Sequence, residues 1–126
     1  MEAVLIDTGV IIGRMRKQAA AFEAFGRIEG ATPVLCDMVV AEVLDGARNK
    51  AEHVRLWSEL HGAFHVLPFT VEVSQMFRKL SGQYELMRHG RFGDVLIAAT
   101  ALAHGCALLT LNKKDFERIT KIADSV

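Results

Sequence analysis

The chain has 126 residues, of which 51% are hydrophobic and 24% charged, a balance typical of a globular domain with a single core. Lys plus Arg and Asp plus Glu number 15 each, so the net charge does not indicate a nucleic-acid partner. No apolar run has membrane-spanning length, and the N-terminus lacks the features of a signal peptide. We therefore expect one cytoplasmic domain over residues 1–126, with Cys36 and Cys106 as buried, reduced thiols.

Short apolar runs alternate with helical patterns from the N-terminus onward. Each run suits a buried strand, and each helical pattern places apolar residues on one face. In the first half of the chain we expect a strand over residues 2–8, a helix over 16–31 that ends at Gly30, a strand over 32–36, a helix over 37–47 with Asp37 as its N-cap, and a helix over 51–62 stopped by Gly62.

The same alternation continues in the second half. We expect a strand over residues 64–69, a helix over 71–87, a nearly all-apolar helix over 94–105, a fourth strand over 106–112, and room for a fifth within 119–126. Apolar strands that alternate with helices are typical of a parallel sheet covered on both faces. The predicted fold is therefore a three-layer α/β/α sandwich with a central parallel sheet of four to five strands.

Four acidic residues fall at places that meet at one edge of such a sheet. Asp7 ends the first strand, Glu42 lies just over one turn into the helix after the second, Asp94 opens the helix before the fourth, and Asp115 follows the fourth. The helix that Asp94 opens runs antiparallel to the strands, so its N-terminus lies at their carboxyl ends. Because ligands bind beyond the carboxyl ends of parallel strands, we expect these acids to converge on one site.

Each acid also has a purely structural explanation. Asp7 and Asp94 could cap helices, and Asp115 lies in a polar stretch where a solvated loop acid is ordinary. Glu42 is harder to explain in this way, because apolar residues surround it and a buried carboxylate needs a cation. An arginine or a metal ion could supply that charge, and no long basic side chain is placed obviously for it.

The residue types favour a metal ion. Two carboxylates about 4 Å apart repel by roughly 4 kcal/mol at an effective dielectric constant of about 20, so a cluster raises its own pKa values or binds a multivalent cation. Carboxylate oxygens without His or Cys suit Mg²⁺ or Mn²⁺ rather than Zn²⁺. Such ions activate water and neutralise the charge on a phosphate, so we expect phosphodiester hydrolysis.

Two other classes of protein use similar acids. Residues 7–9 read Asp-Thr-Gly, as in aspartic proteases, but those proteins are all-β and need two copies of the motif. Here the chain after Gly9 is mostly helical and holds no second copy. A receiver domain needs adjacent acids at the first strand and an Asp after the third, where this chain reads Leu-Pro-Phe-Thr. Both classes are disfavoured.

Three longer motifs carry a resemblance that extends over essentially the whole chain. They are VLIDTGVII at residues 4–12, VVAEVLDGA at 39–47 and GDVLIAATALAHGCALLTLNKKDF at 93–116. Together they resemble the PIN-domain ribonucleases, most closely the VapC-type toxins of bacterial and archaeal toxin–antitoxin pairs. The resemblance implies RNA cleavage with Mg²⁺ or Mn²⁺, a cognate antitoxin protein and frequent homodimers.

The resemblance also assigns roles to individual residues. Those that match the family's acidic metal-binding quartet are Asp7, Glu42, Asp94 and Asp115. Thr110 and Asn112 match polar positions beside the quartet that orient water or an acid, and either Asp115 or Asn112 completes the metal site.

The chain departs from the family pattern at two positions. Gly9 stands where the family often has Asn, and Asp37 where it often has Ser or Thr. Basic residues flank the acids in the sequence, and among them we expect Arg91 and Lys113 to contact the substrate. The remaining alternative is a catalytically silent PIN-like interaction module, which the intact acids disfavour.

Overall fold

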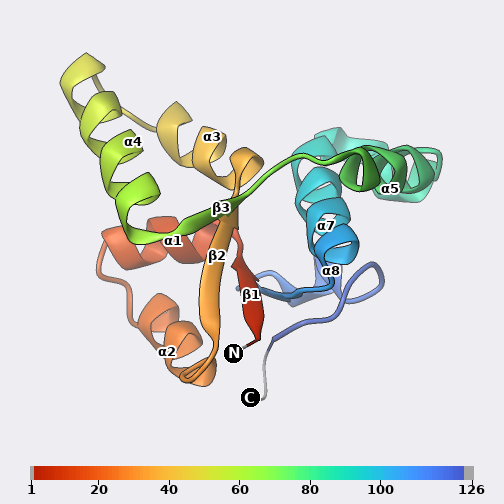
Figure 1. Ribbon diagram of the computed structural model, residues 1–126, viewed down its shortest axis with the longest axis horizontal. Helices are drawn as coiled ribbons and strands as arrows, with labels where there is room; N and C mark the ends of the chain where they lie inside the picture. The colour runs from red at the N-terminus through yellow and green to blue at the C-terminus, as the bar shows by residue number, and fades with distance from the viewer. Residues whose placement is uncertain (1, 124–126) are drawn as a thin grey trace.

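A parallel sheet of four strands runs through the centre of the molecule (Figure 1). The structure is a computed structural model and describes residues 2–123. The strands are β1 (Ala3–Ile6), β2 (Thr32–Cys36), β3 (His65–Leu67) and β4 (Ala107–Leu109), in the spatial order β3-β2-β1-β4. All three pairings are parallel.

Helices cover both faces of this sheet. In Figure 1, α1 (Thr8–Met15) and α2 (Ala19–Arg27) lie to the left of the sheet, and α5 (Val71–Ser81) and α7 (Phe92–His104) lie to the right. The remaining helices are α3 (Asp37–Asp45), α4 (Lys50–Ala63), α6 (Tyr84–Met87), the 3-10 turn η1 (Arg88–Gly90) and α8 (Lys113–Phe116). The prediction of a three-layer α/β/α sandwich is confirmed. Over residues 2–123, no helix combines the length and the apolar character needed to cross a membrane.

Helix α7 is the most deeply buried helix of the right-hand layer. Small residues, including Ala98, Ala99 and Ala101, are fully buried on it and allow the sheet and α5 to pack closely. Its one fully buried polar side chain, Thr100, donates its hydroxyl hydrogen to the carbonyl oxygen of Leu96 at 2.8 Å. The tight packing of α7 fixes the position of its N-terminus, where Asp94 lies.

The strand order places a topological switch point between β1 and β4. From β1 the chain moves to β2 and β3 on one side, and it then returns to form β4 on the other side of β1. The backbone N–H of Asp7 donates to the carbonyl oxygen of Leu109 at 2.9 Å, which joins the two carboxyl ends. Such a point is where parallel α/β sheets bind their ligands.

The N-terminal third differs from the prediction. The sequence suggested one helix over residues 16–31, but the structure has a helix directly after Asp7, a break around Lys17 with φ of 56°, and then α2, which ends at Arg27. Helix α1 was missed because residues 10–12 form a short apolar run, and such a run does not distinguish a helix from a strand.

Smaller differences follow along the chain. The helix predicted over residues 71–87 is interrupted at Gly82 and Gln83, and Gly62 lies inside α4 instead of ending it. Asp37 is the first residue of α3, whose N-cap is Cys36. Cys106 is partly exposed, although Cys36 is buried.

The possible fifth strand is reduced to a single parallel bridge between Leu108 and Ile122. Residues 124–126, at the end of that prediction, lie outside the described part of the chain.

Candidate active site

Asp7 stands at the switch point between β1 and β4. It is the N-cap of α1, and its Oδ1 accepts a hydrogen bond from the backbone N–H of Thr8 at 2.8 Å. Its Oδ2 accepts one from the hydroxyl of Thr110 at 2.7 Å. Burial raises the pKa of Asp7, these hydrogen bonds oppose the rise, and the charges of Glu42 and Asp115 add to it. Asp7 is thus both a helix cap and an acid in a negative environment.

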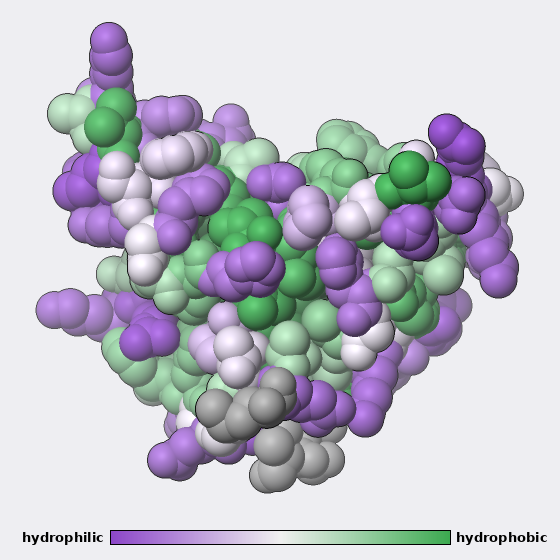
Figure 2. All heavy atoms as spheres, viewed as in Figure 1, coloured by the Kyte–Doolittle hydropathy of each residue, from purple (hydrophilic) through white to green (hydrophobic). Residues whose placement is uncertain are grey.

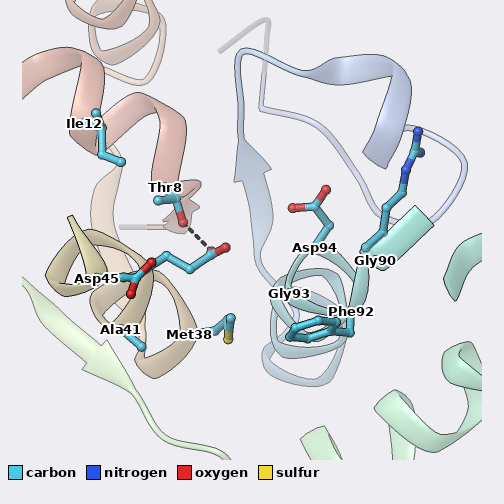
Figure 3. Close-up of a pocket in the computed structure, with 11 residues that line it drawn as sticks. Thr8, Ile12, Met38, Ala41, Asp45, Gly90, Phe92, Gly93 and Asp94 are labelled. Carbon is cyan, nitrogen blue, oxygen red and sulfur yellow. Dashed lines mark hydrogen bonds between the residues drawn. The ribbon is translucent and has the colours of Figure 1, made fainter. Parts of the chain in front are cut away.

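Glu42 approaches Asp7 from α3. Its Oε1 accepts a hydrogen bond from the hydroxyl of Thr8 at 2.7 Å, which Figure 3 marks with a dashed line. The side chain is partly buried, so Glu42 is more exposed than its apolar neighbours in the sequence suggested. Thr8, rather than an arginine, is its hydrogen-bond partner.

The third acid, Asp94, lies in the first turn of α7. The structure places Arg91 at the N-cap position and Asp94 three residues further on, so Asp94 does not cap this helix. Figure 3 shows its carboxylate pointing into the space between α7 and Thr8. Burial raises the pKa of Asp94 from 3.8 to about 6, and the charges of Asp7, Glu42 and Asp115 contribute, while Arg91 opposes the rise. Three further acids therefore act on Asp94.

Asp115 is held by two neighbours. Its Oδ1 lies 3.0 Å from Nη1 of Arg91 in an ion pair, and its Oδ2 accepts a hydrogen bond from the side-chain amide of Asn112. The backbone N–H of Asn112 donates to the Thr110 hydroxyl at 2.9 Å, which connects Asp115 to Asp7 through two residues. Arg91, expected to contact the substrate, has an acid of the same cluster as its partner. Lys113 is exposed on α8.

A pocket of about 650 Å³ opens beside these acids. It lies where α1, α3 and the start of α7 meet, and Figure 3 shows side chains from all three helices facing it. Its lining residues are Thr8, Ile12, Met38, Ala41, Glu42, Asp45, Gly90, Arg91, Phe92, Gly93 and Asp94. Glu42 and Asp94 thus belong to its wall, and Asp7 and Asp115 act on it by charge.

Two residues of this site were not recognised from the sequence. The first is Thr8, which orients Glu42 and also donates its backbone N–H to Asp7. The second is Gly93, where a Cβ atom would lie 3.1 Å from the Met38 methyl carbon and 3.2 Å from Oε2 of Glu42. A hydroxyl directly after Asp7 and a glycine directly before Asp94 were the available signals.

The chemistry of the donors fits a hard divalent cation. The acids offer carboxylate oxygens, and neither His nor Cys is among the described residues that line the pocket. As the side chains stand, no three His, Cys, Asp or Glu residues between positions 2 and 123 lie close enough together to hold an ion. An ion would have to compete with Thr8 for Glu42 and with Arg91 for Asp115. Fold and pocket together define a parallel α/β protein with an acidic site at its switch point.

Comparison with known proteins agrees with this class. The family model of the PIN domain matches residues 4–122. Ribonuclease VapC1 of Rickettsia felis is 31% identical over 122 residues, which cover 92% of this chain and 90% of that protein. Ribonuclease VapC10 of Mycobacterium tuberculosis is 31% identical over 111 residues, covering 86% and 82%. The chain belongs to the PIN-domain family and is a relative of its VapC ribonucleases.

Solved structures share the fold. A toxin–antitoxin complex from Klebsiella pneumoniae contains a chain that superposes with a TM-score of 0.75 at 24% identity, covering 98% of this chain and 99% of that one. VapBC-1 from nontypeable Haemophilus influenzae superposes with a TM-score of 0.72 at 25% identity, covering 93% and 92%. The expected resemblance to PIN-domain ribonucleases of the VapC type is therefore confirmed.

Proposed function

We propose that this protein is a metal-dependent endoribonuclease and the toxin of a toxin–antitoxin pair. The observation that carries the proposal is that Glu42 and Asp94 line one open pocket. There burial, and then the charges of Asp7, Glu42 and Asp115, raise the pKa of Asp94 to about 6. Acidic residues whose pKa values are raised by burial and by neighbouring charges, in a pocket, are candidates for a functional site. The relatives described above carry the name ribonuclease, which supports RNA as the substrate.

The residues of the chain have distinct roles in this proposal. Asp7, Glu42 and Asp94 would hold Mg²⁺ or Mn²⁺, together with Asp115 or Asn112. When bound, such an ion activates water and neutralises charge on the phosphate that is displaced. Thr8 and Thr110 fix the carboxylate of Asp7 from two sides by hydrogen bonds.

Three further hydrogen bonds keep Glu42 and Asp115 in place. The hydroxyl of Thr8 keeps Glu42 turned toward α1. Arg91 and Asn112 hold Asp115 at the edge of the site. Side chains of the protein itself therefore orient these carboxylates by hydrogen bonds.

The test is cleavage of a pool of cellular RNA by the purified protein, with Mn²⁺ and with EDTA. We expect cuts within RNA chains in Mn²⁺ and none in EDTA. Asp7→Asn keeps the shape of the side chain but removes its charge, so cleavage should fall by roughly 100-fold or more. Glu29→Gln, an exposed acid in the turn before β2, is the matched control and should cleave like wild type. Cleavage that persists in EDTA would exclude the metal mechanism.

The proposed partner is a small antitoxin protein, and the proposed place of action is the cytoplasm, where cellular RNA is present. The solved structures with the same fold include toxin–antitoxin complexes, some bound to DNA. Figure 2 shows hydrophobic side chains gathered in the hollow at the centre of one face, with hydrophilic ones around them. A surface of this kind suits a protein partner, either an antitoxin or a second copy in a homodimer.

Expression in a bacterial host tests the toxin assignment. We expect growth to stop when the protein is expressed alone and to resume when a small protein encoded beside it is co-expressed. Harmless expression combined with strong RNA cleavage in vitro would exclude the toxin role and leave the nuclease. Antitoxin binding without any cleavage in Mn²⁺ would instead support a silent interaction module.

A further inference from the structure

We propose that a second pocket, beside Thr110, binds a backbone phosphate of the RNA, next to the phosphate that is cleaved at the acids. The proposal rests on the proposed ribonuclease function. The pocket has a volume of about 420 Å³. Its lining residues are Arg27, Thr110, Leu111, Asn112, Lys113 and Lys114.

The charge of this pocket is unusual for the molecule. Three of its lining side chains are cationic and none is a carboxylate, although the chain as a whole is neutral. Four other pockets formed by residues 2–123 each include at least one Glu or Asp in their lining. A concave surface with only positive charge attracts an anion, and a phosphate of nucleic acid is the anion that a nuclease meets along its substrate.

Two of the cations are available for such a ligand. Arg27 ends α2 and Lys114 lies on α8, so they reach the pocket from segments far apart in the sequence. Both are exposed, and in the described part of the chain neither forms an ion pair or a side-chain hydrogen bond. By contrast, Arg48 is paired with Glu52 and Arg91 with Asp115.

Thr110 connects the basic pocket to the acids. Its hydroxyl donates to Asp7 at 2.7 Å and accepts from the backbone N–H of Asn112 at 2.9 Å, and both Thr110 and Asn112 line the basic pocket. Thr110 and Asn112 thus belong both to the basic pocket and to the hydrogen bonds around Asp7. Phosphates repeat along an RNA strand, so a strand with one phosphate at Asp7 can present a neighbouring phosphate to Arg27 and Lys114. Contacts of this kind position the strand and carry no base specificity.

Binding of RNA at several salt concentrations tests the proposal. The probe is a short fluorescent single-stranded RNA of mixed sequence, measured by anisotropy in EDTA so that it is not cleaved. The double variant Arg27→Gln/Lys114→Gln should bind roughly tenfold more weakly at low salt, and the slope of log K against log salt should fall by about 0.7, because the contact with one phosphate is lost. Arg78→Gln/Lys79→Gln on α5 removes the same charge from another element and should leave the slope unchanged.

Cleavage kinetics in Mn²⁺ separate this proposal from the proposed function. The double variant should show a higher KM with kcat nearly unchanged, and melting should confirm that it is folded. If wild type cleaves RNA but the double variant keeps the wild-type slope and KM, the phosphate subsite is wrong and the nuclease stands. The proposal is also overturned if binding of the RNA by wild type does not depend on salt. Poly-glutamate, as a second probe, tests for an acidic protein ligand. If the variant binds RNA like wild type and loses only the binding of poly-glutamate, the pocket is assigned to an acidic protein segment and the proposal is overturned. A pocket that binds only free inorganic phosphate would leave RNA binding by the variant unchanged.

Discussion

Asp94 shows how a single side chain reports on the whole site. The first turn of a helix normally favours a carboxylate, because the N-terminal end of the helix dipole is positive. The pKa of Asp94 is nevertheless raised to about 6, so burial and the surrounding acids outweigh that attraction. A carboxylate in this position reduces the stability of the metal-free protein, which is expected where function rather than folding selects the residue.

Substitution of Asp94 by Asn should therefore stabilise the metal-free protein at neutral pH. The folded chain keeps a proton on Asp94 up to about pH 6, whereas the unfolded chain loses it near 3.8. Folding takes up a proton between these values, so the contribution of Asp94 to the free energy of unfolding falls as pH rises through this range. Because the side chain is partly exposed, we expect a gain of only about 1 kcal/mol, or about 4 °C in Tm, at about pH 7.5.

Thermal melts in EDTA at low salt, at about pH 7.5 and about pH 4, check this prediction. The difference in Tm between Asp94→Asn and wild type should shrink at the lower pH, where Asp94 is protonated in the folded protein. Equal melting temperatures at both pH values would mean that Asp94 is not repelled by the other acids.

At the scale of elements, the site depends on how closely α3 approaches the start of α7. Gly93 makes this approach possible, since the Oε2 atom of Glu42 would lie only 3.2 Å from a Cβ atom at this position. Contacts of 3.2 Å are tighter than ordinary carbon–oxygen packing, so any side chain would push Glu42 aside. The contact between α3 and α7 forms only in the folded protein, and it determines the orientation of the Glu42 side chain.

Gly93→Ala should consequently reduce activity with little change in stability. The atoms that the new methyl group meets, the Met38 methyl carbon and Glu42 Oε2, are ends of flexible side chains that can move. Cleavage should fall roughly tenfold because Glu42 is displaced from its place beside Thr8. Gly62→Ala in α4 is the matched control, since its Cβ would meet nothing within 4 Å. It should gain up to about 1 kcal/mol in stability and cleave normally. Equal cleavage by Gly93→Ala and Gly62→Ala would mean that the site does not depend on the glycine at position 93.

At the scale of the whole molecule, the acids connect distant parts of the chain. Asp7 follows β1, Glu42 lies on α3, and Asp94 begins α7, so an ion held by all three ties both helical layers to the sheet. An ion that binds only the folded chain stabilises it by mass action. Binding of such an ion would therefore be coupled to global stability.

Mn²⁺ should raise the melting temperature of wild type and raise that of Asp94→Asn much less. At a concentration about 100 times Kd, the gain is about 2.7 kcal/mol, or roughly 10 °C for a domain of this size. Calorimetric or fluorescence melts over a series of Mn²⁺ concentrations, reversed by EDTA, measure the effect. Identical Mn²⁺ responses of wild type and Asp94→Asn would place the metal site elsewhere.

The sequence by itself determined the layers of the fold. The β2 segment was predicted at its observed bounds, residues 32–36, and the other strands lie within their predicted segments. Apolar runs determine which segments are buried, and their alternation with helices determines a parallel sheet. Boundaries that depend on single residues, such as the breaks at Lys17 and Gly82, were not predicted, because local breaks leave the apolar pattern intact.

For the candidate site, the sequence determined which acids lie at the carboxyl edge but not how they are held. Asp7 and Asp94 could be placed because strand ends and helix starts in a parallel sheet share that edge. The partners of the acids came only from the tertiary structure: Thr8 for Glu42, 34 residues away, and Arg91 for Asp115, 24 residues away. Such pairs depend on the rotation of each helix against the sheet, and the packing of the complete core sets that rotation.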